Sequence, residues 1–445
     1  MRVALLALAL AVSACSSGPG PSCAGDPAAC RARCGYGSGD LASATLADVA
    51  PRDMPIDTIV LVMQENRTFD HYFSSLTVPG QTVDGAAPDA TNPDPTTPGG
   101  TIARFHQTAA CFDNPAESWD NVHREVDGGA MDGFTTEGAA EDANDPTGAR
   151  AMGYYDETDL PYYYALARAF AISDRHFSSV QANSWTNRLF YMAGTSYGGT
   201  SNVFPNQMDA NGNVYPNLFT RLDAAHVTWG FYVQDVPTLG ILSSTYGHEL
   251  AHVFDFDQFF MDAAAGALPQ VVFVEGTDQM GGASPDEDPP ADIEVGQQMV
   301  ASIVAAVMTS PQWPHTAMFL TYDEQGGLYD HVPPQPACAP DDIPPVLDPG
   351  GVVAAFDQTG LRVPMFAISP YAKRGYVSHV VTDHTSVLRF VEAKFDLPAL
   401  THRDANAVAP FDLFDFSHAD LTVPQLPDAT IDPVKLAACK AKYPH

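Results

Sequence analysis

Oxygen-bearing side chains follow two apolar runs of this 445-residue chain. Glu65 and Asn66 come just after the run 56–63, and Asp323 and Glu324 come directly after the run 317–322. Carboxylate and amide oxygens are hard ligands that suit Mg²⁺, Ca²⁺ or Mn²⁺. Adjacent acids also repel each other unless a cation or a proton lies between them. A solvated loop is the commoner outcome for one such cluster, but two clusters at predicted strand ends favour a divalent metal site.

A hydroxyl group that could act as a nucleophile is offered by Ser184, within the segment 177–190. A serine reacts at neutral pH only when a base or a metal activates it, and the sequence has no G-x-S-x-G nucleophile elbow here. Metal activation is therefore the simpler route. Arg188 follows Ser184 closely, and it would either clamp an anion in a bidentate way or form a structural ion pair.

A competing motif, H-E-x-x-H, occurs at His248, Glu249 and His252. Two histidines one helical turn apart beside a glutamate base are the zinc-binding arrangement of metallopeptidases. The candidate for the required third ligand is Glu275, at the end of the expected strand 270–274. Five-residue patterns also recur by accident in a chain with 14 histidines. The motif therefore indicates either a zinc peptidase or an ordinary surface helix.

Strands and helices alternate along the part of the chain that could position these residues. The expected strands cover residues 56–63, 228–233, 270–274, 317–322 and 363–368, and the expected helices cover 159–171, 292–308 and 383–395. This alternation predicts a layered α/β fold around a largely parallel sheet. Ligands of open α/β sheets bind outside the carboxyl ends of strands, which is where Glu65 and Asn66 would lie.

The N-terminus has the pattern of an export signal, with Arg2 before an apolar run from Val3 to Val12. The following V-S-A-C resembles a bacterial lipobox, which would remove residues 1–14 and leave Cys15 as a lipid-modified N-terminus. The alternative is an ordinary cleaved signal beside a cysteine. Either way we expect an exported protein, as a lipoprotein of the bacterial cell envelope (periplasmic or surface) or in secreted form, and a lipid anchor would tie it to a membrane.

Composition divides the rest of the chain into a tether, a domain and a tail. Residues 15–50 are rich in Gly, Ser, Ala and Pro and predict a tether, 51–420 predict one large globular domain, and 421–445 predict a C-terminal tail. The formal net charge is -33, which makes nucleic acid an unlikely partner. The oligomeric state stays open.

Six cysteines remain once Cys15 is set aside. An even number in an exported protein favours disulfides, one of which would tie the C-terminal tail through Cys439. Six cysteines allow 15 connectivities, and their spacing selects none of them.

Several segments together resemble one known family, the bacterial acid phosphatase and phospholipase C family, a branch of the alkaline-phosphatase-like superfamily. The resemblance covers about residues 57–416. The matching segments are E-N-R-T-F-D-H-Y-F from Glu65, M-D-G-F from Met131, M-G-Y-Y-D-E-T-D-L-P from Met152, N-S-W-T-N-R from Asn183, D-Q-F-F-M-D from Asp257, Y-D-E-Q-G-G-L-Y-D-H-V-P-P from Tyr322, and R-V-P-M-F-A-I-S-P-Y from Arg362 through D-H-T-S-V-L-R-F.

This resemblance implies a three-layer α/β sandwich and a phosphoric ester hydrolase acting on phosphate esters or phospholipids. It implies that one divalent metal is bound by Glu65, Asn66, Asp323, Glu324 and the oxygen of Ser184. Ser184 would attack phosphorus and form a phosphoseryl intermediate that water then hydrolyses. His123 matches a family histidine that contacts the phosphoryl oxygens or assists the leaving group. Whether the metal is calcium, magnesium or manganese stays open.

The chain departs from the family pattern at four positions. Asp288 and Gln325 stand where the family commonly has histidine, and Asn183 and Thr186 stand where it tends to have proline. A missing imidazole would lower the rate, shift the pH optimum or change the substrate. The change at Asp288 also leaves room for a non-catalytic, lipid-anchored surface protein. His331, His379 and His384 are further candidates that rank below His123.

Overall fold

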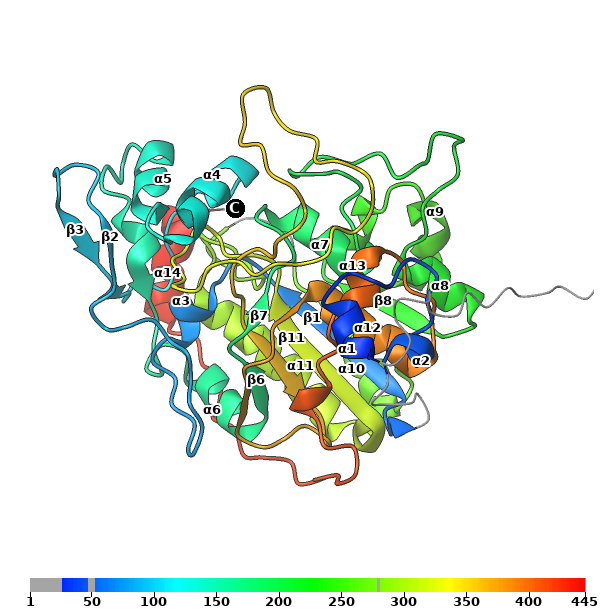
Figure 1. Cartoon of the computed structure of the whole chain (residues 1–445). Coiled ribbons are helices and arrows are strands. Elements are labelled where there is room, and N and C mark those ends of the chain that lie inside the picture. Colours follow the sequence, from blue (N-terminus) through cyan, green and yellow to red (C-terminus); the bar gives the residue numbers. More distant parts are fainter. Residues whose placement is uncertain (1–25, 47–52, 278–280, 445) are drawn as a thin grey trace, which may run out of the picture.

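The computed structural model describes residues 26–46, 53–277 and 281–444. The predicted signal sequence and Cys15 lie outside these residues. A twisted sheet runs through the middle of the molecule, and helices cover both of its faces (Figure 1). No helix in the described part of the chain is long and apolar enough to span a membrane.

The central sheet has eight strands in the order β13-β6-β12-β11-β1-β10-β8-β9. Its strands are β1 (Thr58–Gln64), β6 (Ala171–Ser173), β8 (Trp229–Val233), β9 (Val253–Asp255), β10 (Val271–Glu275), β11 (Thr316–Tyr322), β12 (Met365–Ile368) and β13 (Tyr376–Ser378). Only β12 runs antiparallel to its neighbours β11 and β6. The sheet is therefore largely parallel, as predicted.

Alternate residues of the buried strands point to opposite faces and build two separate cores. In β1, Val60 and Val62 pack into one core, and Ile59 and Leu61 pack into the other. Helices α6 (Pro161–Ala169) and α11 (Ile293–Thr309) cover the first face, and helices α7 (Ser184–Ala193), α8 (Leu218–Ala224) and α12 (His384–Phe395) cover the second. The predicted three-layer α/β sandwich is confirmed.

The predicted strands and helices of this sandwich all occur, with ends displaced by a few residues. The boundary of α11 has a clear local cause, because the side chain of its N-cap Asp292 accepts a hydrogen bond from the backbone N–H of Glu294 at 2.9 Å.

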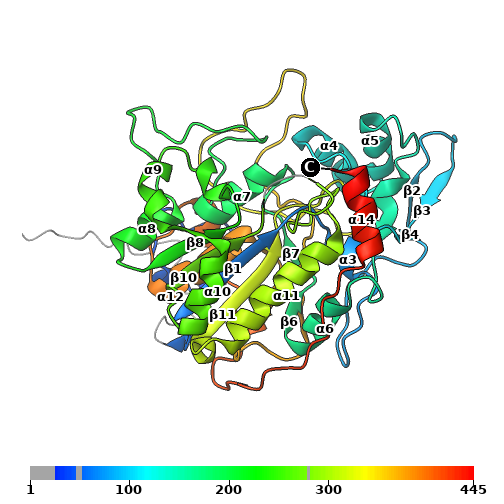
Figure 2. The ribbon, with the colours of Figure 1, turned by 180° about the vertical axis from the view of Figure 1, so that it is seen from behind.

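A lobe of short elements lies beside the sandwich, on the left in Figure 1 and on the right in Figure 2. It contains α4 (Trp119–Val126), α5 (Phe134–Glu141) and the hairpin of β2 (Thr91–Pro93) and β3 (Thr101–Ala103). Part of this lobe is the stretch 79–100, which is rich in Pro, Asp, Gly and Thr, a composition typical of a surface insertion. The remaining short elements are α3 (Phe69–Phe73), β4 (Phe105–His106), β5 (Gly153–Tyr154), β7 (His176–Phe177), α9 (Tyr246–Glu249), α10 (Phe256–Ala265), β14 (Thr382–Asp383) and α13 (His402–Asn406).

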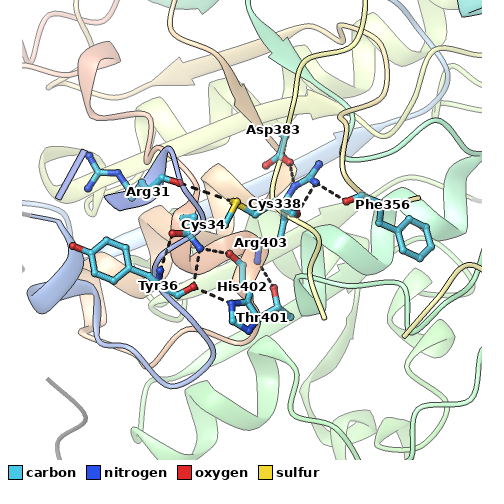
Figure 3. Close-up of a disulfide and its surroundings, with 10 residues drawn as sticks. Arg31, Cys34, Tyr36, Cys338, Phe356, Asp383, Thr401, His402 and Arg403 are labelled. Atoms are coloured by element: carbon cyan, nitrogen blue, oxygen red, sulfur yellow. Dashed lines mark hydrogen bonds and ion pairs between the residues drawn. A yellow bond between two sulfur atoms is a disulfide. The ribbon is translucent and has the colours of Figure 1, made fainter. Parts of the chain in front are cut away.

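Residues 26–46 fall inside the predicted tether, yet they pack against the sandwich. They form α1 (Pro27–Arg31) and α2 (Ala42–Thr45), and the Cys34–Cys338 disulfide joins them to a loop of the domain. Figure 3 shows this disulfide and the neighbouring contact of 3.0 Å between His402 Nδ1 and the carbonyl oxygen of Tyr36. This segment is part of the folded body, because its Cys30, Tyr36, Ala42 and Leu46 side chains are buried against the domain.

The C-terminal tail ends in helix α14 (Pro433–Lys442), which a Cys111–Cys439 disulfide fastens to the sandwich (Figure 2). Cys30 is also disulfide-bonded. These bonds confirm the disulfides that the even number of cysteines predicts for an exported protein.

Candidate active site

The two predicted oxygen clusters lie at the same edge of the sheet. Strands β1 and β11 are parallel neighbours, and their last residues, Gln64 and Tyr322, are paired. The residues that follow must therefore meet, and the backbone N–H of Asn66 donates a hydrogen bond to Asp323 Oδ1 at 3.1 Å. Asn66 has a positive φ of 60°, which turns the chain sharply at the strand end.

Ser184 is the first residue of helix α7 and lies against the first cluster. Its hydroxyl Oγ is 3.1 Å from Glu65 Oε2 and 3.3 Å from Asn66 Oδ1. The preceding residue, Asn183, has extended backbone angles, and Gly194 in the left-handed region ends the helix. The hydroxyl therefore stands at the helix N-terminus, where the helix dipole favours negative charge.

Arg188, one helical turn beyond Ser184, joins three buried carboxylates. Its guanidinium lies 2.5 Å from Glu65, 3.0 Å from Glu275 and 3.1 Å from Asp323. Because these bonds engage the Nε and both terminal nitrogens, the arrangement favours a structural ion-pair network over a phosphate clamp. Asp323 is thereby fixed between the backbone of Asn66 and this guanidinium.

A second pair of carboxylates lies on the other side of Asn66. The side-chain amide nitrogen Nδ2 of Asn66 donates hydrogen bonds to Glu117 Oε2 at 2.8 Å and to Asp288 Oδ1 at 2.7 Å. Sequence reasoning missed Glu117, because no strand precedes it and it lies in an irregular segment before α4. Asp288 was recognised only as a departure from the family pattern.

The neighbouring Glu287 holds Asp288 in place. Its buried carboxylate accepts hydrogen bonds from the hydroxyls of Tyr72 at 2.6 Å, Tyr322 at 2.8 Å, and Tyr163. These three tyrosines come from separate elements of the sandwich. The segment that presents Asp288 to Asn66 is thus anchored to the core.

The carboxylates around Asn66 are hard to ionise together. Burial and the nearby Glu65 raise the pKa of Glu117 to about 7. Burial, followed by the charge of Glu117, raises the pKa values of Asp288 and Glu324 well above their usual range. Burial and the charge of Glu65 do the same to the pKa of Asp323. Neighbouring positive charge would relieve this strain, and Arg188 supplies only one unit of it.

Unpartnered polar atoms provide an independent test of whether a cation fits. Glu324 is fully buried, and its Oε1 has no hydrogen-bond partner, while its Oε2 accepts from the backbone N–H of Gly326 at 2.8 Å. Neither amide atom of the buried Gln325 has a partner either. A buried carboxylate oxygen without a donor is costly unless a ligand satisfies it, so the residues fit a hard cation.

Closer groups of acidic and histidine ligands lie elsewhere in the described part of the chain. Three ligand atoms approach within 4.8 Å of one another in the group of Asp70, Asp330 and His331, and again in the group of His106, Asp156 and Asp159. In the first of these groups, both carboxylates already pair with the buried Arg362. That group therefore forms a structural network.

His123 lies on α4 and is held by its own helix. Its Nδ1 is 2.7 Å from the carbonyl oxygen of Trp119, and its ring lies 4.3 Å from the indole ring. Burial lowers its pKa, so it is neutral near pH 7 with the proton on Nδ1. No hydrogen bond joins His123 to Ser184 within the described residues. The helix is nevertheless close, because Trp119 packs in one cluster with Ala182.

The other candidate histidines have structural partners. His331 bonds to Asp70 at 2.6 Å, and His379 bonds to Asp174 at 2.8 Å. His384 is fully buried and bonds to the carbonyl oxygen of Tyr322 at 2.9 Å. These contacts give the three rings structural partners, and no hydrogen bond joins any of them to Ser184 within the described residues.

The H-E-x-x-H residues do not form a metal site in the described part of the chain. Helix α9 ends at Glu249, and His252 stacks on Trp229 with ring centroids 4.0 Å apart. None of the close ligand groups includes His248 or His252. The proposed third ligand, Glu275, is engaged by Arg188. The geometry thus disfavours the zinc peptidase interpretation.

Comparisons with known proteins agree on one family. The model of the phosphoesterase family matches residues 56–398. "Non-specific phospholipase C6" of Arabidopsis thaliana is 30% identical over 83% of this chain and 74% of its own length. "Phospholipase C B" of Mycobacterium tuberculosis (strain CDC 1551 / Oshkosh) is 29% identical over 81% of this chain and 78% of its own length.

Among solved structures, a protein of the alkaline phosphatase superfamily from Vibrio parahaemolyticus matches with a TM-score of 0.35 and 8% identity. The match covers 68% of this chain and 74% of that chain. A likeness this distant carries no functional inference.

Proposed function

Since the chain belongs to the phosphoesterase family and hydrolyses phosphoester bonds, we propose that it is a metal-dependent enzyme of the phospholipase C type with Ser184 as its nucleophile. The observation that carries this proposal is the position of the Ser184 hydroxyl, 3.1 Å from Glu65 and 3.3 Å from Asn66 at the N-terminus of α7.

Each step of the proposed reaction uses residues of this edge of the sheet. Ser184 Oγ attacks phosphorus and its proton leaves toward Glu65, which already accepts its hydrogen bond. The bond from phosphorus to the leaving alcohol breaks, and the departing alkoxide takes up the proton that Glu65 received from Ser184, so that a neutral alcohol leaves and Glu65 is again a carboxylate. Water then attacks the phosphoseryl group, releases the phosphoryl product and restores the hydroxyl. The helix dipole stabilises negative charge on the serine oxygen throughout.

The proposed metal ligands are Glu65, Asn66, Asp323, Glu324 and the oxygen of Ser184. The unpartnered Oε1 of Glu324 and the all-oxygen donor set support a hard divalent ion. Such an ion, when bound, would offset negative charge on the phosphoryl and serine oxygens. Arg188 holds two of these carboxylates in place.

We further propose that His123 acts through Nε2. Because Nδ1 faces the carbonyl oxygen of Trp119, Nε2 carries the free lone pair of the neutral ring. That atom would accept a proton from the water that attacks the phosphoseryl group. A lowered pKa suits this basic role better than protonation of the leaving alcohol.

The phospholipid diester is the substrate class that we favour over a phosphate monoester. The relatives cited above carry the name phospholipase C, and they align over most of the chain. The disulfides support an exported protein, and a lipid anchor at Cys15 would place it in the bacterial cell envelope.

A substrate panel tests the proposal. The full chain is assayed on an aryl phosphate, an aryl phosphorylcholine and phosphatidylcholine, first with chelator and then with Mg²⁺, Ca²⁺ or Mn²⁺ added back. We expect hydrolysis of the two choline esters, loss of that activity with chelator, and recovery with one of the metals. Full activity after thorough metal removal contradicts the metal-dependent mechanism, and hydrolysis of the aryl phosphate alone contradicts the phospholipid class.

A further inference from the structure

Two loops carry exposed apolar side chains above helix α7. We call residues 196–208 and 343–356 the rim loops. The first is drawn in green and the second in yellow, and both rise on the side of the molecule where β1 and β11 end (Figures 1 and 2). The exposed fractions are 66% for Val203, 58% for Phe204, 70% for Val346 and 86% for Val353. We call these four the rim residues. Large apolar side chains that are this exposed, on two loops bonded to each other, are compatible with an interaction surface.

The first rim loop is built directly onto the residue after Ser184. Trp185 packs on Phe204 with ring centroids 5.0 Å apart. The backbone N–H of Trp185 donates a hydrogen bond to Asn202 Oδ1 at 2.9 Å. This loop therefore stands immediately beside the start of α7, which carries the proposed nucleophile.

The second rim loop is fastened near its C-terminal end to the same region. Its Val352 carbonyl accepts a hydrogen bond from the indole N–H of Trp119 at 3.0 Å. Phe356 packs on Trp119 in a cluster that includes Ala182, two residues before Ser184. Both rim loops thus rest on the elements that hold the proposed active site.

The two rim loops are also bonded to each other. The hydroxyl of Thr200 donates to the carbonyl oxygen of Val346 at 2.6 Å, and the backbone N–H of Val346 donates to the carbonyl oxygen of Gly198 at 2.8 Å. The exposed side chains of Val203, Phe204 and Val346 are therefore carried by one connected structure. Their exposure is a fixed feature of the fold.

The charges around the rim indicate what it contacts. Residues 196–208 contain no Asp, Glu, Lys or Arg, and residues 343–356 contain only Asp348, although the whole chain has a net charge of -33. Surfaces that bind anionic lipids need clusters of Lys or Arg, and here there are none. An acidic protein whose apolar rim loops carry a single charge, that of Asp348, is repelled by an anionic surface and is compatible with a neutral one.

We propose that the rim residues insert into the surface of zwitterionic phospholipid and hold the active site against it. This inference rests on the proposed function, because it names where the phospholipid substrate is met. Apolar side chains at an interface bind by moving into the boundary between headgroups and acyl chains. The choline headgroup and its phosphate would then lie at the depth of Ser184, while the acyl chains stay in the lipid.

The test uses the full chain with Val203→Ser, Phe204→Ser, Val346→Ser and Val353→Ser combined, called the rim variant. Its control carries Leu421→Ser and Val434→Ser, two exposed apolar residues far along the chain from the rim loops. Every protein keeps the same N-terminus, so any membrane binding through that end is equal in all of them. Co-sedimentation is measured with phosphatidylcholine vesicles and with vesicles that also contain phosphatidylglycerol.

We expect the rim variant to lose at least about tenfold in affinity for phosphatidylcholine vesicles, because four exposed apolar side chains lose their burial. Its rate on vesicles should fall similarly, while its rate on soluble aryl phosphorylcholine stays within about twofold of the native chain. The control should match the native chain. Phosphatidylglycerol should weaken binding of all three proteins.

Vesicle binding distinguishes this inference from the proposed function, because binding needs no catalysis. It is therefore also measured with the Ser184→Ala variant. Equal vesicle binding by the rim variant and the control overturns the inference even if hydrolysis is observed. A dimer that the rim variant abolishes, or tighter binding to phosphatidylglycerol vesicles, also overturns it. Absence of any phosphoester hydrolysis overturns the proposed function while leaving the binding result to stand by itself.

Discussion

Ser184 Oγ and Glu65 Oε2 lie 3.1 Å apart, although 119 positions separate the two residues in the sequence. Neither residue is positioned by the other. Glu65 follows a strand in the middle of the sheet, and Ser184 begins a helix on one of its faces. The pair meets because Arg188, in the same helix as Ser184, bonds to Glu65 and anchors the helix to the strand end.

Replacing Ser184 tests the nucleophile. Ser184→Ala should lower kcat on aryl phosphorylcholine by at least about 10³-fold, because the variant lacks the hydroxyl that attacks phosphorus in the proposed reaction. Ser184→Thr should keep measurable activity, since it retains the hydroxyl. The control is Ser43→Ala on the exposed side of α2, which should behave as the native chain. Undiminished release of phosphorylcholine by Ser184→Ala would remove this residue from the mechanism.

Arg188 should be among the most important side chains for stability. Arg188→Met leaves Glu65, Glu275 and Asp323 buried without their cation, and loss of one partner from a buried ion pair costs about 3–5 kcal/mol. Urea unfolding at pH 7 measures this change. The matched variant is Arg168→Met, whose pair with Glu157 is more exposed and should be worth less than about 1 kcal/mol. Equal losses in the two variants would contradict the network.

Sequence patterns predicted the sheet edge well, because strand periodicity is a local property. The runs before Glu65 and Asp323 are neighbouring strands, so the oxygen-bearing side chains that follow them lie together. Glu117 could not be found in this way, since it follows no periodic element and joins the site through a contact with the amide of Asn66. The packing of residues 26–46 was equally hidden, because a disulfide to Cys338 fixes a segment of low hydrophobicity.

Replacing Glu324 tests whether this residue binds the proposed metal ion. Glu324→Gln keeps the size of the side chain but removes its negative charge. The unpartnered Oε1 of Glu324 would then no longer belong to a charged carboxylate. We expect the dissociation constant for the activating cation to rise at least about tenfold. Titration calorimetry on the full chain measures it without any activity assay. The control Glu157→Gln removes an exposed carboxylate and should leave it unchanged, and an unchanged constant in Glu324→Gln would exclude Glu324 as a ligand.

Glu249 links the competing motif to the stability of the fold. Burial raises its pKa to about 7, and Asn217 Nδ2 donates a hydrogen bond to its Oε1 at 3.3 Å. The folded chain therefore retains a proton that the unfolded chain releases near its ordinary pKa of about 4.5. Stability must fall as the pH rises through this interval, because the unfolded state binds fewer protons.

Glu249→Gln removes this loss, since the amide has no charge to bury. The free energy of unfolding of the variant, relative to the native chain, should therefore rise between pH 5 and pH 8 by on the order of 2 kcal/mol. Urea unfolding at several pH values measures the change. Glu157→Gln is a control with a pKa shift in the opposite direction. The hydrogen bond from Arg168 lowers the pKa of Glu157, whereas burial raises that of Glu249. Phosphoester hydrolysis by Glu249→Gln should be unaltered, whereas a peptidase activity that disappears with Glu249 would restore the zinc interpretation.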